Sequence, residues 1–223
     1  MSSYSPRGRT GLGVFASGRG SNFQAIIDSV ESGYLAVEIK VLIADNEGAF
    51  ALDRARKHGI ESLVVRPKGF ESRDAYFEML VGELRAREVD LVVLAGFMRI
   101  VGKPLLDAFP NRVMNIHPAL LPSFPGLHGQ KQAAEYGVKI SGCTVHFVDE
   151  GMDTGPVIIQ AAVPVLYDDT EESLSERILR LEHRIYPEAI KLFAEDRLEV
   201  IGRKVRISGR GPSEESLVNP APT

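Results

Sequence analysis

The sequence predicts an α/β protein with a doubly wound, mostly parallel sheet and an antiparallel extension in its C-terminal half. Short apolar runs alternate with amphipathic, helix-like segments from residue 12 to residue 117, which is typical of a parallel sheet. Residues 90–95 (DLVVLA) form a continuous apolar run, as expected for a strand covered by helices on both faces. Beyond residue 140 the rhythm changes to two longer strand-like segments, 141–148 and 157–165.

The elements of the first half follow one another in a regular order. Apolar runs predict strands over residues 12–16, 37–44, 61–65, 90–95 and 112–116. A helix starts near Phe23, a second ends at Gly59, and others cover 72–87 and 103–109. The helix over 72–87 is expected to bury a stripe that contains Ala75, Met79, Leu80 and Leu84.

The second half begins with residues 120–129, which carry two prolines and two glycines and are expected to form a loop that acts as a lid. A short helix over 131–136, the two long strands and a hairpin of strands 198–201 and 204–207 are predicted. Thr170 caps a long helix whose apolar stripe is formed by Leu174, Ile178, Leu181, Ile185 and Leu192. We expect one domain over 11–207, with halves 11–117 and 118–207, and flexible tails at 1–10 and 208–223.

Composition excludes several classes of protein. A formal charge of −4 argues against a nucleic-acid partner. The one cysteine, Cys143, excludes an internal disulfide, is expected to be a small buried side chain, and belongs to no zinc-like cluster, so no metal is expected. The polar first ten residues predict no secretory signal, and no apolar stretch approaches the roughly 20 residues of a membrane span. A cytoplasmic protein without a membrane partner is expected.

The glycine turn after the first strand suggests a phosphate site. It begins like a dinucleotide fingerprint with Gly18 and Gly20, but Phe23 occupies the third glycine position, and the Lys-Ser/Thr ending of a P-loop is missing. Gly20, Ser21 and Asn22 remain as a tight turn into a helix N-terminus, whose free amides suit a single phosphate. A plain strand–helix connection is the alternative. Asp45, after the second strand, is expected to cap a turn rather than to bind a ribose.

Asn115 and His117 stand two residues apart at the end of a predicted strand, so on an extended backbone both side chains leave the same face. Pro118 favours the extended conformation at His117. A carboxamide beside an imidazole suits a reaction that builds negative charge on a carbonyl oxygen and moves a proton. The alternative is a strand that ends in a turn, with the histidine satisfied by backbone groups.

The acidic loop 149–155 offers His117 a partner. Asp153 is the preferred one, because a carboxylate beside an imidazole orients the ring and favours its protonated form. Asp149 and Glu150 compete for this role, and the spacing does not separate the three acids. Any of them could instead solvate a turn.

Other polar positions carry weaker signals. Thr144 and His146 share one face of a strand and are expected to support the site or to satisfy each other. Arg99 could anchor an anionic ligand or be an exposed cation at a strand end. Glu182 and His183 flank the apolar stripe of the long helix, where most such residues are solvated.

Five segments, in this order and spacing, resemble the glycinamide ribonucleotide formyltransferase family, folate-dependent enzymes of purine synthesis. They are 17–22 (SGRGSN), 94–100 (LAGFMRI), 115–118 (NIHP), 121–128 (LPSFPGLH) and 153–157 (DTGPV). The resemblance extends from about Gly13 to Leu198. Arg19 departs from it where a smaller polar residue is common, and Leu179 where a polar one can occur.

The resemblance implies a role for each matching residue. It implies a catalytic trio of Asn115, His117 and Asp153, a phosphate cradle of Gly20, Ser21 and Asn22, and a contact of Glu182 with the glycinamide part of the substrate. It also implies that 10-formyltetrahydrofolate, the formyl donor, is bound by Arg73, Met98, Arg99, Ile100, Val101, Asn115, Asp149, Glu150, Gly151, Met152 and Asp153. Arg73 lies near a helix start, where a cation opposes the dipole and so suggests a separate reason for its presence.

The implied reaction is direct formyl transfer to the amine of 5'-phosphoribosylglycinamide through a tetrahedral intermediate, without a metal or a covalent enzyme intermediate, in a monomer or homodimer. Methionyl-tRNA formyltransferase should carry a further tRNA-binding domain, for which few residues follow the last predicted strand. Formyltetrahydrofolate hydrolase should carry an amino-terminal regulatory domain, for which few residues precede the first strand. From other classes, an NAD-dependent oxidoreductase is disfavoured by the missing third glycine, and a purely structural protein leaves the polar trio unexplained.

Overall fold

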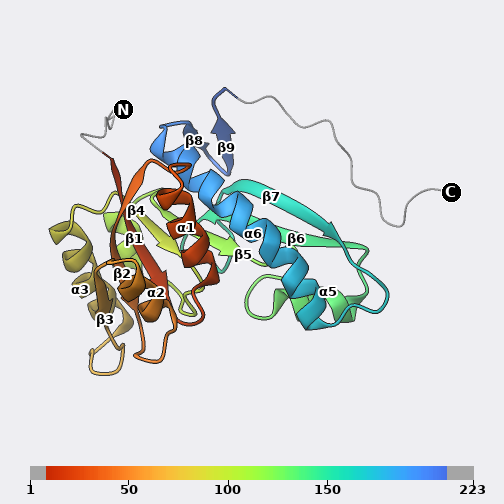
Figure 1. Ribbon diagram of the computed structural model, residues 1–223, viewed down its shortest axis with the longest axis horizontal. Coiled ribbons are helices and arrows are strands. Elements are labelled where there is room, and N and C mark those ends of the chain that lie inside the picture. Colours follow the sequence, from red (N-terminus) through yellow and green to blue (C-terminus); the bar gives the residue numbers. More distant parts are fainter. Residues whose placement is uncertain (1–8, 210–223) are drawn as a thin grey trace. The chain divides into compact units, whose positions relative to one another are not determined.

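The structure, a computed structural model, describes residues 9–209 of the chain (Figure 1). It divides into two compact units, Met1–Met114 and Asn115–Thr223. The predicted division into halves after residue 117 lies close to this boundary. The flexible tails predicted at 1–10 and 208–223 lie almost entirely outside the described residues.

The first unit is a parallel sheet in the order β3-β2-β1-β4. Its strands are β1 (Thr10–Ala16), β2 (Val37–Ala44), β3 (Ser62–Val64) and β4 (Leu91–Leu94). All three strand pairs are parallel, and the β1–β2 register shifts between Leu12 and Gly13. Because the chain leaves β1 towards β2 on one side and returns to β4 on the other, the order reverses between β1 and β4. Ligands of such sheets bind at the carboxyl ends of the strands at this reversal.

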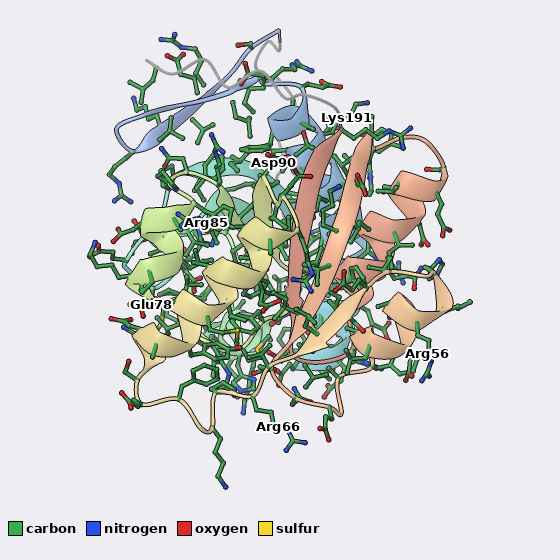
Figure 2. All side chains as sticks on the ribbon, turned by 90° about the vertical axis from the view of Figure 1, so that its left-hand side faces the viewer. Arg56, Arg66, Glu78, Arg85, Asp90 and Lys191 are labelled. Carbon is green, nitrogen blue, oxygen red and sulfur yellow. The ribbon has the colours of Figure 1, made fainter. Side chains whose placement is uncertain are left out.

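Helices cover both faces of this sheet. They are α1 (Ser21–Glu31), α2 (Ala51–Lys57), α3 (Arg73–Ala86) and α4 (Lys103–Ala108). Figure 2 shows Arg56 of α2 on one side of the sheet and Glu78 and Arg85 of α3 on the other. It also shows Asp90, before β4, and Arg66, after β3, at opposite ends of the strands, so that Arg66 marks the carboxyl edge. The unit is therefore doubly wound, as predicted.

Two helices of the first unit differ in detail from the prediction. The helix α1 begins at Ser21, earlier than expected, because Gly20 serves as its N-cap without a capping side chain and Ser21 and Asn22 are already helical. The buried face of α3 is formed by Tyr76, Phe77, Leu80, Val81 and Leu84, whereas Ala75 and Met79 are only half-buried. The predicted stripe was therefore rotated, because the two large aromatic rings occupy its centre.

The second unit holds the antiparallel extension. Strand β5 (Val113–His117) contains the boundary between the units, and the order continues β5-β6-β7-β9-β8. Strands β6 (Ile140–Phe147) and β7 (Val157–Pro164) pair antiparallel, and β8 (Leu198–Ile201) and β9 (Lys204–Ile207) form the expected hairpin. The helices are α5 (Gly129–Tyr136) and α6 (Glu171–Ala194), and α6 packs against β6, β7 and α5. The predicted fold class is confirmed.

The long helix α6 is capped as predicted but buries a different stripe. The Thr170 side chain accepts from the Ser173 backbone N–H, and the Ser173 side chain accepts from the Thr170 backbone N–H. Its most buried positions follow the spacing Leu174, Ile178, Glu182, Tyr186 and Ile190, whereas the expected Leu181 and Ile185 are half-buried. Glu182 therefore lies within the buried stripe, 6% exposed, and does not flank it in solvent.

Within residues 9–209, no helix is long and apolar enough to cross a membrane.

Candidate functional site

The glycine turn of the first unit presents the N-terminus of α1. Gly20 has φ +66°, and a Cβ there would lie 2.8 Å from the Cβ of Ala51, so both the backbone and the space require glycine. The turn is held to α2 by bonds from the Ala51 amide to the Gly18 carbonyl and from Arg54 Nε to the Arg19 carbonyl. These contacts fix the backbone of the turn where β1 ends and α1 begins, and a helix N-terminus held in this way suits a phosphate.

The loop after β4 lies beside this turn at the sheet reversal. Gly96, at φ +79°, accepts from the Ser17 amide at 3.0 Å, and the Ser17 hydroxyl accepts from the Met98 amide at 3.0 Å. Phe97 packs edge-on against Phe15 of β1 at 5.2 Å between centroids. Anchored in this way, the loop presents large apolar side chains to solvent: Met98 is 63% exposed and Ile100 54%. Exposed apolar groups beside a tethered backbone suit a flat heterocyclic ligand.

Arg99 is paired with Asp45 rather than unpaired in solvent. Its Nε donates to Asp45 Oδ2 at 2.6 Å, and the Asn46 amide donates to Asp45 Oδ1 at 2.9 Å. Asp45 is 6% exposed. The expectation that Asp45 caps the following turn is therefore wrong. The physical reason is that a buried carboxylate requires a cationic partner, which Arg99 supplies from the next loop. Arg73 is exposed as the first residue of α3, and Val101 is buried.

In the second unit, β5 delivers Asn115 and His117 to the same side, as the strand period requires. His117 is 4% exposed. Its Nε2 lies 2.9 Å from the Phe124 carbonyl oxygen, and its Nδ1 lies 3.3 Å from Asp153 Oδ2. Both ring nitrogens thus face acceptors. A neutral imidazole can donate to one of these acceptors, and the imidazolium can donate to both.

Of the three candidate acids, the structure brings Asp153 to His117. The same oxygen, Asp153 Oδ2, accepts from the Gly126 amide at 2.8 Å. Asp149 instead closes its own loop, because its Oδ1 accepts from the Thr154 hydroxyl at 2.6 Å and from the Gly151 amide at 3.1 Å. Glu150 is exposed in the same loop. Close to Asp153, Met152 is 54% exposed.

His146 is the site residue whose role the sequence did not resolve. Its Nδ1 lies 2.9 Å from the Phe147 carbonyl and must donate to it. Burial lowers its pKa, so the ring is neutral and Nε2 is left as an acceptor. That Nε2 lies 3.2 Å from Asn115 Nδ2, which donates one of its two N–H groups to it. His146 therefore fixes the orientation of the Asn115 carboxamide, with the NH2 end turned towards the imidazole. Asp153 Oδ1 lies 3.7 Å from His146 Nε2.

Thr144 does not bond to His146 but ties down the segment that follows His117. Its hydroxyl donates to the Ala119 carbonyl at 2.7 Å and accepts from the Leu121 amide at 3.1 Å. Gln160 of β7 adds bonds to the Thr144 hydroxyl at 3.0 Å and to the Leu121 carbonyl at 2.9 Å. The start of the 120–129 loop is therefore fixed by two strands, while its later residues contact His117 and Asp153.

Glu182 and Cys143 are two further buried side chains of the second unit. Cys143 is fully buried, as predicted. Burial, and to a smaller extent the negative charge of Glu182, raise the pKa of its thiol to about 12. Glu182 is thus an acidic side chain inside the protein, 6% exposed and within electrostatic range of Cys143 in β6. Within residues 9–209, no cluster of His, Cys, Asp and Glu side chains has the arrangement of a metal site.

Comparisons with known proteins agree with this description. Residues 12–190 match the family model for formyl transferases. A solved structure of glycinamide ribonucleotide transformylase 1 from Symbiobacterium toebii is 53% identical, with a TM-score of 0.89 over 93% of this chain and 98% of that one. The phosphoribosylglycinamide formyltransferase of Bacillus subtilis is 44% identical over 80% of this chain and 91% of its own length.

A second kind of relative is much longer. The trifunctional purine biosynthetic protein adenosine-3 of Drosophila melanogaster is 48% identical over 82% of this chain. The chain spans only 14% of the length of that relative.

Proposed function

This chain belongs to the formyl transferase family, and we propose that it transfers a formyl group from 10-formyltetrahydrofolate to the amine of 5'-phosphoribosylglycinamide. The products are N-formylglycinamide ribonucleotide and tetrahydrofolate, in the synthesis of purines (IMP). The observation that carries the proposal is the network in which the Asn115 carboxamide and the His117 imidazole, held by Asp153, present oriented donors on one side of β5. Such donors stabilise a carbonyl oxygen that becomes an oxyanion.

The proposed reaction is a direct acyl transfer. The lone pair of the substrate amine forms a bond to the formyl carbon, and the carbonyl π electrons move to its oxygen, giving a tetrahedral intermediate. The bond from that carbon to the folate nitrogen then breaks, and the oxyanion returns to a carbonyl. The amine loses one proton, and the departing folate nitrogen gains one. His117 and Asp153 are placed to relay this proton, directly or through water.

The contacts of His117 support its role as a cation. Its Nδ1–H side faces the Asp153 carboxylate, which compensates the charge of the imidazolium. Its Nε2–H donates to the Phe124 carbonyl, a neutral acceptor. We assign that N–H to the oxyanion in the reaction, because a full negative charge is the stronger acceptor. Phe124 would then have to yield this bond when substrate binds, which gives the 120–129 loop its function as a lid.

Asn115 supplies the second donor. One N–H of its Nδ2 group donates to His146, and this bond fixes the rotation of the carboxamide, so that the second N–H has a defined direction. A rigid amide costs little reorganisation when charge develops beside it. His146 thus acts as a positioning residue through Asn115.

The two substrates are assigned to the remaining groups. Gly20, Ser21 and Asn22 bind the phosphate, because they lie at the N-terminus of α1, where the helix dipole has its positive end. Glu182, a buried carboxylate, contacts the glycinamide part of that substrate. The pterin of the donor is bound by 98–101 and 149–153, through backbone groups and the exposed Met98, Ile100 and Met152 side chains. Arg73 takes a carboxylate of the folate.

We propose a cytoplasmic enzyme, monomeric or homodimeric, that requires neither a metal nor a nucleic-acid or membrane partner. The test mixes the protein with 10-formyltetrahydrofolate and follows loss of the formyl group with and without 5'-phosphoribosylglycinamide. Turnover that depends on the amine supports the proposal. Equal turnover without the amine would make the chain a hydrolase, and no turnover with both substrates would refute the assignment.

A further inference from the structure

We propose that Asp45 is a positioning residue for the formyl donor: its ion pair with Arg99 holds the loop 97–101 in the shape that binds the folate. The inference rests on the proposed function, because it takes that loop as part of the donor site. It adds a residue, Asp45, from another strand, and it changes the role of Arg99 from a ligand for an anion to a structural cation.

The contacts around Asp45 connect three strand ends of the first unit. The carboxylate of Asp45, directly after β2, accepts from Arg99 in the loop after β4. The Asn46 side chain donates to Asp45 and also to the Ser17 carbonyl, directly after β1, at 2.9 Å. Ser17 in turn accepts from the Met98 amide at 3.0 Å. The loop is thus held at Met98 by a hydrogen bond and at Arg99 by an ion pair.

The loop depends on these tethers because its own side chains provide little packing. Phe97 and Val101 are buried at its two ends, but Met98, Arg99 and Ile100 between them are exposed. Beyond it, Gly102 lies so close to Phe77 of α3 that a Cβ there would be 2.5 Å from the ring. The loop is therefore fixed at both ends, and the Asp45–Arg99 pair restrains its middle.

The burial of the Asp45–Arg99 pair explains why its loss should disturb the loop 97–101. The side chain of Asp45 is 5% exposed, so its charge cannot be solvated if Arg99 leaves. Arg99 is 43% exposed, so the pair is only partly screened. Both charges also act on the buried Tyr76, whose pKa is raised to about 12, first by burial and then by Asp45, with Arg99 opposing.

The test compares steady-state kinetics of Asp45→Asn, Arg99→Gln and the double variant with the wild type. Asp45→Asn keeps an oxygen for the Asn46 amide but removes the charge. We expect it to raise KM for 10-formyltetrahydrofolate roughly tenfold, between the small effect of an exposed pair and the large effect of a buried one. KM for 5'-phosphoribosylglycinamide and kcat should change less than about twofold. The reason is that the variant weakens binding of the donor equally in the ground state and in the transition state.

The two single variants and the double variant form a double-mutant cycle, which tells whether Arg99 positions the loop through Asp45 or contacts the donor directly. If the pair acts as a unit, the double variant is no worse than either single variant, and Arg99→Lys recovers most of the affinity. A larger effect of Arg99→Gln than of Asp45→Asn, adding in the double variant, would show that Arg99 binds the donor itself and would overturn the proposal. Unchanged donor KM in Asp45→Asn, or equal losses in every kinetic constant, would overturn it as well.

The matched control is Glu47→Gln. Glu47 stands two residues from Asp45 and forms an exposed ion pair with Arg66, at the edge of the sheet that Figure 2 shows, so its loss should change neither KM. Equilibrium titration with a folate that lacks the formyl group gives a readout without turnover. If the wild type shows no amine-dependent turnover, the proposed function fails. If the titration shows no weakening in Asp45→Asn, only this inference fails.

Discussion

Replacing His146 by leucine removes the acceptor that orients the Asn115 carboxamide while keeping the volume of the side chain similar. In the structure, Asn115 Nδ2 donates to His146 Nε2 at 3.2 Å, and this bond distinguishes the two ends of the amide. Without it, the amide oxygen can turn towards the reacting carbonyl, where it repels the developing negative charge. Leucine leaves His117 and Asp153 in place, so the expected loss is confined to one donor.

The magnitude follows from two limits. Complete loss of one oxyanion donor costs on the order of 10²–10³ in kcat. An amide that turns freely between two orientations would lose only about twofold, since half of the molecules remain competent. We therefore expect kcat of His146→Leu to fall ~10- to 100-fold, or about 1.4–2.7 kcal/mol in the barrier. KM for both substrates should change little.

The assay is steady-state formyl transfer with both substrates saturating, alongside a thermal melt for each variant. His146→Gln is the matched variant, because its Oε1 can replace Nε2 as the acceptor, and it should recover most of the activity. His58→Gln, which removes an imidazole from an ion pair with Glu31 in the first unit, should leave kcat unchanged. Full activity in His146→Leu, or equal losses in the Leu and Gln variants, would refute the orientation of Asn115 by His146.

Four further outcomes are expected. His117→Ala should nearly abolish turnover with an unchanged circular-dichroism spectrum; near-normal activity would remove His117 from the mechanism. Thr144→Val strands the Leu121 amide and the Ala119 carbonyl and should lower the free energy of unfolding in urea by about 2–4 kcal/mol, and an unchanged midpoint would contradict this. Burial lowers the pKa of His146, so this imidazole binds a proton more tightly in the unfolded chain than in the folded protein. The free energy of unfolding of the wild type should therefore fall as the pH drops below about 6.5, and that of His146→Gln should fall less. Arg177 holds the pKa of Asp169 well below its usual range, so the Asp169 carboxylate stabilises the folded state. Wild type should therefore be more stable than Asp169→Asn by a constant amount above about pH 4, and the difference should vanish as the pH falls further. A pH-independent difference would contradict the pairing.

The parts of the fold that local patterns determine were predictable from the sequence. Strand β2 and the hairpin β8–β9 have the predicted bounds, because apolar runs and a glycine turn define them locally. The α6 cap was likewise readable from Thr170. The buried stripe was not, because Glu182 occupies a core position that hydrophobic periodicity assigns to an apolar residue.

The site divides in the same way. The strand period alone put Asn115 and His117 on one face. The choice of Asp153 over Asp149 depends on how the 149–155 loop folds on itself, which the spacing does not specify. The Asp45–Arg99 pair joins residues 54 positions apart, and neither shows its partner locally. His146 carried one signal, its shared face with Thr144, but its tautomer is set by the Phe147 carbonyl and becomes apparent only in three dimensions.

The central claim is that the formyl group passes directly to the amine of 5'-phosphoribosylglycinamide. The most direct measurement follows an isotopically labelled formyl carbon by NMR in a mixture of labelled 10-formyltetrahydrofolate, 5'-phosphoribosylglycinamide and the protein. We predict that the label appears in the new amide, in step with loss of the donor, and that no labelled formate forms when the amine is omitted. Labelled formate as the main product, with or without the amine, would contradict the account.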